Sequence, residues 1–146
     1  MEESELSRSF RTLTRLHRGI NSRYLEQYNL YLGQPRILFL IDRNPGITVS
    51  RLVEETEQTK EALSVSVRRL EEAGYLRKER NPEDQREKFL YLSEQGKIIA
   101  DTIKTEFLHL NNAMFEPLTE DEKVLLEALF TRMSARLIRF KEEHQR

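Results

Sequence analysis

The chain has 146 residues, of which 38% are apolar and 34% are charged, with 5 glycines, 4 prolines and no cysteine. This composition excludes a disordered chain, because enough apolar surface is present to form a core, and a sandwich of many short strands, because turn formers are scarce. With 24 basic and 25 acidic residues the net charge is −1, so any binding to nucleic acid requires charges sorted onto one face. The absence of cysteine excludes disulfides, thiol chemistry and cysteine-ligated zinc.

Hydropathy gives no sign of a membrane segment. The N-terminal residues carry no apolar stretch, and no run approaches 18 apolar residues. We therefore expect neither a signal peptide nor a membrane span, and we expect a cytoplasmic protein.

The first half of the chain is predicted to hold one long helix and three short ones. Residues 6–28 place large apolar side chains three and four positions apart, which is typical of an amphipathic helix. A second helix is predicted over residues 36–43, because the proline before it suits a first helical turn. Thr48 and Thr59 are candidate N-caps of two further helices, the second of which is expected to end at Gly74.

The pattern then changes to a β-hairpin followed by two long helices. Residues 75–80 and 88–92 are predicted to be short strands, and the charged segment 81–86 between them is typical of an exposed turn. A helix is expected from residue 93 to about residue 114. Residues 119–122 form a predicted capping box that opens the last helix.

These elements predict a mainly α fold with a small β-hairpin wing, in which a winged helix-turn-helix core is flanked by N- and C-terminal helices. We expect one domain over residues 1–146, with a DNA-binding lobe at 34–92 and dimerisation helices at 1–32 and 93–146. The terminal helices carry apolar stripes that a small core cannot cover, and large exposed apolar patches usually mark an interface. Folding of these helices back onto their own chain is the alternative.

Groups suited to catalysis or metal binding are sparse. His17, His109 and His144 lie far apart, and none has a second ligand at the spacing of a metal motif. The sequence has neither a glycine-rich phosphate loop nor a strand-turn-helix nucleophile motif. The sequence therefore predicts no enzyme, no metal site and no cofactor.

The helix after Thr59 and the hairpin carry side chains suited to reading DNA. Lysine, arginine, serine and glutamate on the outer face of this helix can bond to base edges, and its N-terminus can present N–H groups to a phosphate. At the hairpin, Arg86 can enter a minor groove and Lys88 can meet a phosphate. The predicted DNA contacts are Thr59, Lys60, Glu61, Ser64, Arg68, Arg69, Arg86 and Lys88.

The charge balance leaves a second interpretation open. Residues 60–88 contain eight basic and seven acidic side chains, so the segment is not a basic tail. A winged helix with this balance also suits a protein-interaction adaptor that binds no specific DNA.

Three motifs carry a resemblance to a known family. They are the run RRLEEAGYL over residues 68–76, the wing pair Asp84-x-Arg86, and the run LSEQG over residues 92–96. In this register they resemble the MarR family of bacterial winged-helix regulators. The resemblance implies that Arg86 contacts the minor groove and that Asp84 supports the wing loop. Gln85 departs from the pattern, because family wings often carry a second arginine there.

The resemblance also implies partners. It implies a homodimer that binds a roughly palindromic operator in double-stranded DNA, usually as a repressor, and that is released by a small phenolic or lipophilic effector. Tyr24, Tyr28 and Phe39 are candidates to line an effector crevice, but aromatic residues at helical spacing equally suit a core. The effector site is therefore left unassigned.

Overall fold

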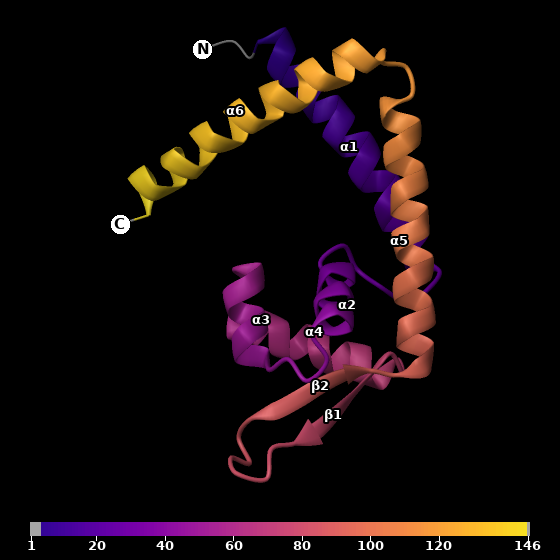
Figure 1. Ribbon diagram of the computed structural model, residues 1–146, viewed down its shortest axis with the longest axis vertical. Coiled ribbons are helices and arrows are strands. Elements are labelled where there is room, and N and C mark those ends of the chain that lie inside the picture. Colours follow the sequence, from indigo (N-terminus) through magenta and orange to yellow (C-terminus); the bar gives the residue numbers. More distant parts are fainter. Residues whose placement is uncertain (1–3, 146) are drawn as a thin grey trace. The chain divides into compact units, whose positions relative to one another are not determined.

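The computed structural model describes residues 4–145, so the outermost residues of the predicted domain lie outside the described part. Its contacts divide the chain into two compact units, Met1–Phe107 and Leu108–Arg146. The described residues form six helices and one two-stranded antiparallel sheet. The prediction of a mainly α fold with a small hairpin is confirmed (Figure 1). The assignment of a lobe and of dimerisation helices stays a prediction.

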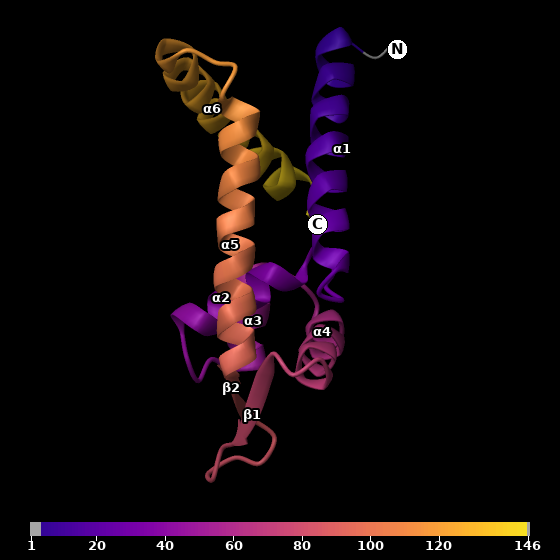
Figure 2. The same cartoon turned by 90° about the vertical axis from the view of Figure 1, so that its right-hand side faces the viewer.

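Helix α1 (Glu5–Glu26) is the long amphipathic helix expected at the start of the chain. Its N-cap is Ser4, whose hydroxyl accepts a hydrogen bond from the Ser7 N–H at 3.1 Å. Within the helix only Leu25, near its C-terminal end, is fully buried, while the rest of the apolar stripe is exposed. Figure 2 shows this helix extending away from the winged-helix core of the first unit, with its N-terminus at the far end.

The core of the first unit lies among α2 (Gln34–Arg43), α3 (Val49–Thr56) and α4 (Lys60–Glu72). The predicted N-caps are confirmed, because the Thr48 hydroxyl accepts from the Arg51 N–H at 3.2 Å and the Thr59 hydroxyl from the Ala62 N–H at 3.1 Å. Each cap uses an N–H that the helix itself cannot pair. The largest fully buried apolar side chains are Leu25, Ile37, Leu38, Ile41, Leu52, Leu63, Leu70, Leu90 and Ile103.

The wing is a hairpin of β1 (Leu76–Arg80) and β2 (Lys88–Leu92), in a register that places Leu76 opposite Leu92. Gly74, at φ +86°, ends α4 in the left-handed conformation that favours glycine. The sequence did not predict a third strand position in front of α3. Ile47 forms an isolated antiparallel bridge with Leu90 on the free edge of β2.

Helix α5 (Glu94–Phe115) follows β2 after one residue, Ser93. The Ser93 N–H donates to the Tyr75 carbonyl oxygen at 3.0 Å, and its hydroxyl donates to the Gly74 carbonyl oxygen at 2.5 Å. The same hydroxyl accepts from the Gly96 N–H at 3.0 Å. A Cβ on Gly96 would lie 1.8 Å from the Tyr75 carbonyl oxygen, so only glycine fits this close approach. The serine and glycine of the LSEQG run therefore fasten α5 to the end of α4.

An ion cluster joins α2 to α5 inside the first unit. The Asp42 carboxylate lies 3.0 Å from the Lys97 ammonium and 3.1 Å from the Lys104 ammonium, and its side chain is 15% exposed. Burial raises the pKa of Asp42, but the hydrogen bonds from the two lysines outweigh it and hold that pKa below the ordinary value. The two lysine charges thus favour the ionised form of this carboxylate more than burial disfavours it.

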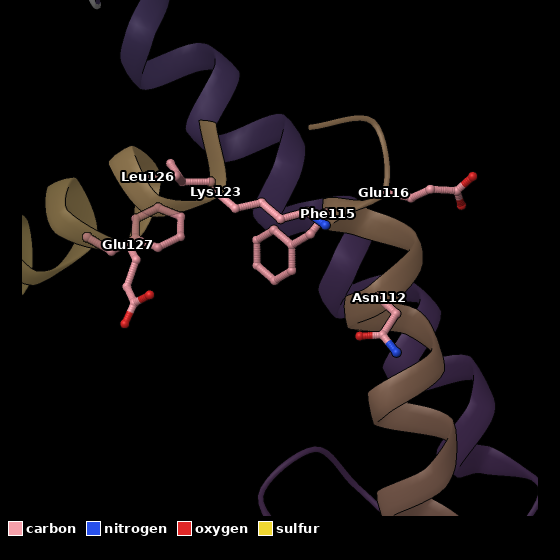
Figure 3. A pocket seen from close by; sticks show the side chains of 7 residues that line it. Asn112, Phe115, Glu116, Lys123, Leu126 and Glu127 are labelled. Carbon is pink, nitrogen blue, oxygen red and sulfur yellow. The ribbon is translucent and has the colours of Figure 1, made fainter. Parts of the chain in front are cut away.

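The second unit holds the end of α5 and helix α6 (Glu120–His144). The predicted capping box is confirmed: the Thr119 hydroxyl accepts from the Glu122 N–H, and the Glu122 carboxylate accepts from the Thr119 N–H at 2.9 Å. No residue of α6 is buried. A partly apolar hollow of about 550 Å³ lies where α6 follows α5, and Figure 3 shows the side chains that line it. It is lined by Asn112, Phe115, Glu116, Lys123, Leu126, Glu127 and Phe130.

Among residues 4–145, no helix combines the length and the apolar character that crossing a membrane requires.

Candidate nucleic-acid interface

A concave surface lies between the start of α3, one face of α4 and the wing, with a volume of about 390 Å³. We call it the α4–wing groove. It brings together five of the nine side chains that the sequence assigned to DNA binding or wing support: Lys60, Ser64, Asp84, Arg86 and Lys88. Its other lining residues are Thr48, Val49, Ser50, Val67, Lys78, Glu87 and Leu90.

Helix α4 contributes its polar flank to the groove. Leu63, Val67 and Leu70 are buried as predicted, so the helix is fixed by its apolar face. Lys60 and Ser64, four residues apart, then lie together on the flank that faces the wing.

The other predicted residues of α4 lie outside the groove lining. Glu61 and Arg68 are exposed on α4, and Thr59 is exposed at its N-cap. Arg69 lies elsewhere, since its guanidinium carbon is 5.4 Å from the centroid of the Tyr31 ring, in the segment between α1 and α2. The structure therefore brings Lys60 and Ser64 to the wing but directs Arg69 to another neighbour.

The wing loop is held by its own polar side chains. The Asp84 carboxylate accepts from the Arg86 N–H at 3.0 Å, and the Asp84 carbonyl oxygen accepts from the Glu87 N–H at 3.1 Å. The Asn81 side-chain oxygen accepts from the Glu83 N–H at 2.9 Å. Such side-chain turns define the path of a short loop. The geometry supports the role given to Asp84, and the Arg86 side chain stays exposed beside it.

Sequence reasoning missed Lys78 as a groove residue. Lys78 lies on β1, and its ammonium group is 3.4 Å from the carboxylate of Glu71 on α4. Its side chain is 25% exposed and lines the groove. The alternation of side chains along β1 could have indicated that Lys78 faces the groove. Residues two positions apart in a strand lie on the same face, and Lys78 is half-buried two positions after buried Leu76.

The groove is cationic although the whole chain is not. Lys60, Lys78, Arg86 and Lys88 line it, against the two carboxylates of Asp84 and Glu87. Charges are thus sorted by face, as DNA binding by a chain of net charge −1 requires. Residues 4–145 contain no cluster of three or more histidine, aspartate or glutamate side chains suited to a metal ion.

The three aromatic residues considered for an effector crevice are half-buried and pack against the core. The Tyr24 and Tyr28 rings meet edge-on with centroids 5.6 Å apart, and Phe39 meets Phe107 in the same way at 6.2 Å. Burial of the Tyr24 hydroxyl raises its pKa, with a smaller contribution from Tyr28. These contacts account for the aromatic residues as packing, and the effector site stays unassigned.

Comparison with known proteins identifies relatives of this arrangement. A family model described as MarR family matches residues 28–87. The transcriptional regulator HosA of Escherichia coli O111:H- is 30% identical over 110 residues, which cover 70% of this chain and 82% of HosA. A crystal structure of MarR is 28% identical, with a TM-score of 0.76 over 98% of this chain and 97% of that one. The fold is also shared by Streptococcus pneumoniae FabT in complex with DNA, at 19% identity and a TM-score of 0.81, over 93% of this chain and 97% of FabT.

These relatives are regulators of transcription, which confirms the prediction that the chain is not an enzyme. They also agree with the expected winged-helix fold, because the structural match extends along almost the whole chain.

Proposed function

Because the chain belongs to the MarR family of transcriptional regulators, we propose that it acts as a homodimer that binds a palindromic operator in double-stranded DNA. The observation that carries this proposal is the α4–wing groove, where four cationic side chains from a helix and a hairpin gather on one face. Sorting of charge onto one concave surface is what a near-neutral chain needs to hold a phosphate backbone. That FabT binds DNA with the same fold supports this role.

In this model α4 lies in the major groove and the wing reaches the minor groove. Ser64 and Arg68 are exposed on α4, and their hydroxyl and guanidinium groups can bond to base edges. Arg86 is held at the wing by the Asp84 turn, in a position suited to a minor groove. Lys60 and Lys88 then neutralise phosphates, while Lys78, paired with Glu71, lines the same groove.

The homodimer is proposed from the exposed apolar surface of α1 and α6. On α1, Leu6 is 82% exposed and Phe10 is 59% exposed, and on α6 Leu137 is 68% exposed. Side chains of this size in continuous stripes usually lie in an interface, and a two-fold dimer places two α4 helices on two half-sites one DNA turn apart. The expected cytoplasmic location stays a prediction.

We also propose that the protein represses and that a small effector releases it, as the resemblance implies. An effector acts this way only if it binds the DNA-free state more tightly than the DNA-bound state. A panel of simple phenols and lipophilic acids is expected to contain a member that raises the Kd for operator DNA. If no phenol or lipophilic acid changes that Kd, release by this class of effector is refuted.

The experiment that tests DNA binding is fluorescence anisotropy with labelled DNA from upstream of the protein's own gene, against a scrambled duplex, at about 50 and 200 mM salt. Saturable, sequence-preferring binding that weakens steeply with salt, with two chains per site, is the expected result. If neither duplex binds, and a random-sequence selection also enriches nothing, the adaptor interpretation replaces this one.

Variants separate the two parts of the groove. Arg86→Ala is expected to weaken binding to all sequences. A guanidinium in the minor groove interacts mainly with the width and negative potential of that groove, which depend less on individual bases than base-edge contacts do. Ser64→Ala and Arg68→Ala are expected to change which bases are preferred, by roughly 5- to 100-fold at one position. The same loss on operator and random DNA for all three variants would refute this division of roles.

A further inference from the structure

One face of α1 carries a row of arginines that the proposed operator complex does not use. Arg8, Arg11, Arg15 and Arg18 follow one another at spacings of three, four and three residues, so they lie on one side of the helix. All four are exposed. No acidic residue occurs between Glu5 and Glu26. We call this face the α1 arginine row.

The row lies opposite the apolar stripe of the same helix. At 100° per residue, Leu6, Phe10 and Leu13 project from the side of α1 away from the arginines. A dimer that buries the apolar stripe therefore leaves the α1 arginine row open to solvent.

The row borders a shallow hollow of about 740 Å³. Arg11, Arg15 and Arg18 line this hollow together with the hydroxyl side chains of Thr12, Thr14 and Ser22. Among the residues that the structure describes, no carboxylate lines it. Guanidinium and hydroxyl groups are the donors that hold phosphate oxygens in proteins.

One further arginine, on α4, lies next to the segment that borders the hollow. Leu32 also lines the hollow. The residue before it, Tyr31, has the Arg69 guanidinium carbon 5.4 Å above its ring. Arg69, which does not line the α4–wing groove, thus lies against the residue that precedes Leu32.

We propose that the α1 arginine row binds the phosphate backbone of a second DNA segment while the α4–wing groove holds the operator. The proposal rests on the proposed function, since it assumes that the groove is filled by DNA. Four arginines within about 15 Å of helix form a linear array of charge that matches a linear polyanion. The segment is separate from the operator because α1 leads away from the wing, as both views show (Figures 1 and 2).

The makeup of the hollow favours nucleic acid over an acidic protein. Interfaces between proteins usually have an apolar centre with aromatic anchors. Among the described residues that line the hollow, Leu32 is the one large apolar side chain, and the others are charged, hydroxylated or glycine.

The test uses the full-length protein saturated with a short unlabelled operator duplex, to which a labelled random duplex is added. We expect a ternary complex, observed as a rise in anisotropy of the labelled duplex, with a steep loss between about 50 and 200 mM salt. The variant Arg8→Gln/Arg15→Gln/Arg18→Gln is expected to lose this complex and to lower the salt slope by about 2 to 3, while operator binding keeps its wild-type Kd. The matched control, Arg43→Gln/Arg132→Gln/Arg139→Gln, removes the same charge from exposed positions outside the row and is expected to keep the complex.

Three outcomes overturn the proposal. They are the absence of a ternary complex with saturated wild-type protein, equal loss in the row and control variants, and displacement of the labelled duplex by poly-glutamate as readily as by unlabelled DNA at matched charge. The last would identify the row as a surface for an acidic protein. If the wild type binds no operator at all, the proposed function fails instead, which the first anisotropy experiment reports separately.

Discussion

Replacement of Gly96 by alanine is predicted to destabilise the fold by about 3 kcal/mol. The new Cβ would lie 1.8 Å from the carbonyl oxygen of Tyr75 and 2.8 Å from its carbonyl carbon. Real Cβ atoms keep at least 3.0 Å from such atoms, so α5 and the end of α4 must separate by about 1.2 Å. The obstacle is backbone, so no flexible side chain can move away to relieve it.

The magnitude follows from two costs. Overpacking of a close contact costs about 1–3 kcal/mol, with rigid backbone at the upper end. Separation also stretches the bond from the Ser93 N–H to the same Tyr75 oxygen, which contributes about 1 kcal/mol. For a chain of this length a loss of about 3 kcal/mol lowers Tm by roughly 6–12 °C.

The assay is urea unfolding followed by circular dichroism at one fixed protein concentration, because a dimer's stability depends on concentration. Gly19→Ala is the matched control, since a Cβ on Gly19 in the middle of α1 has no atom within 4 Å. It is expected to raise stability by about 0.5–1 kcal/mol, as alanine does in an open helix. If Gly96→Ala unfolds at the wild-type midpoint or above it, the reasoning about this contact is wrong.

Three further changes address the ion cluster, the capping box and α6. Asp42→Asn is expected to cost about 2 kcal/mol at pH 7, because the two lysine bonds lose their charge. Since the folded pKa of Asp42 lies below its ordinary value of 3.8, this stabilisation is present above that value and is lost as pH falls through the folded pKa. Unfolding curves at pH 7 and pH 3 check both points, and an equal difference between wild type and variant at the two pH values would contradict them. Thr119→Ala is expected to cost about 1 kcal/mol and to bring the pKa of Glu122, lowered by the Thr119 N–H and hydroxyl, back toward its ordinary value in an NMR titration. A chain ending at Pro117 is expected to be monomeric in light scattering, and a dimer of that chain would remove α6 from the interface.

The helix ends were predictable because their signals are local. Thr48, Thr59 and Thr119 each precede a helix and accept an N–H from its first turn, so four consecutive residues contain the whole interaction. Gly74 ends α4 for an equally local reason. The hairpin followed in the same way from a turn-forming segment between two short alternating runs.

The interactions that sequence reasoning missed join residues far apart in the chain. Asp42 meets Lys97 and Lys104 more than fifty positions away, and neither helix alone shows a partner for it. Arg69 was assigned to DNA from its residue type, but its contact with Tyr31, 38 positions earlier in the chain, depends on the tertiary fold. The bridge of Ile47 to Leu90 involves one residue, which is too short to give a period-two pattern.

The single residue between β2 and α5 limits where the chain can accept insertions. Ser93 leaves no spare length, and both of its hydrogen-bonding groups are used at the end of α4. One residue added there would turn α5 by about 100° relative to β2 and carry the Ile99 and Ile103 side chains out of the core. The hydrogen bonds that the structure gives for the loop 81–87 lie within the loop itself. An added residue there would change the wing tip but leave the α5 side chains in the core, so length variation among related wings is expected at the tip and not at the junction.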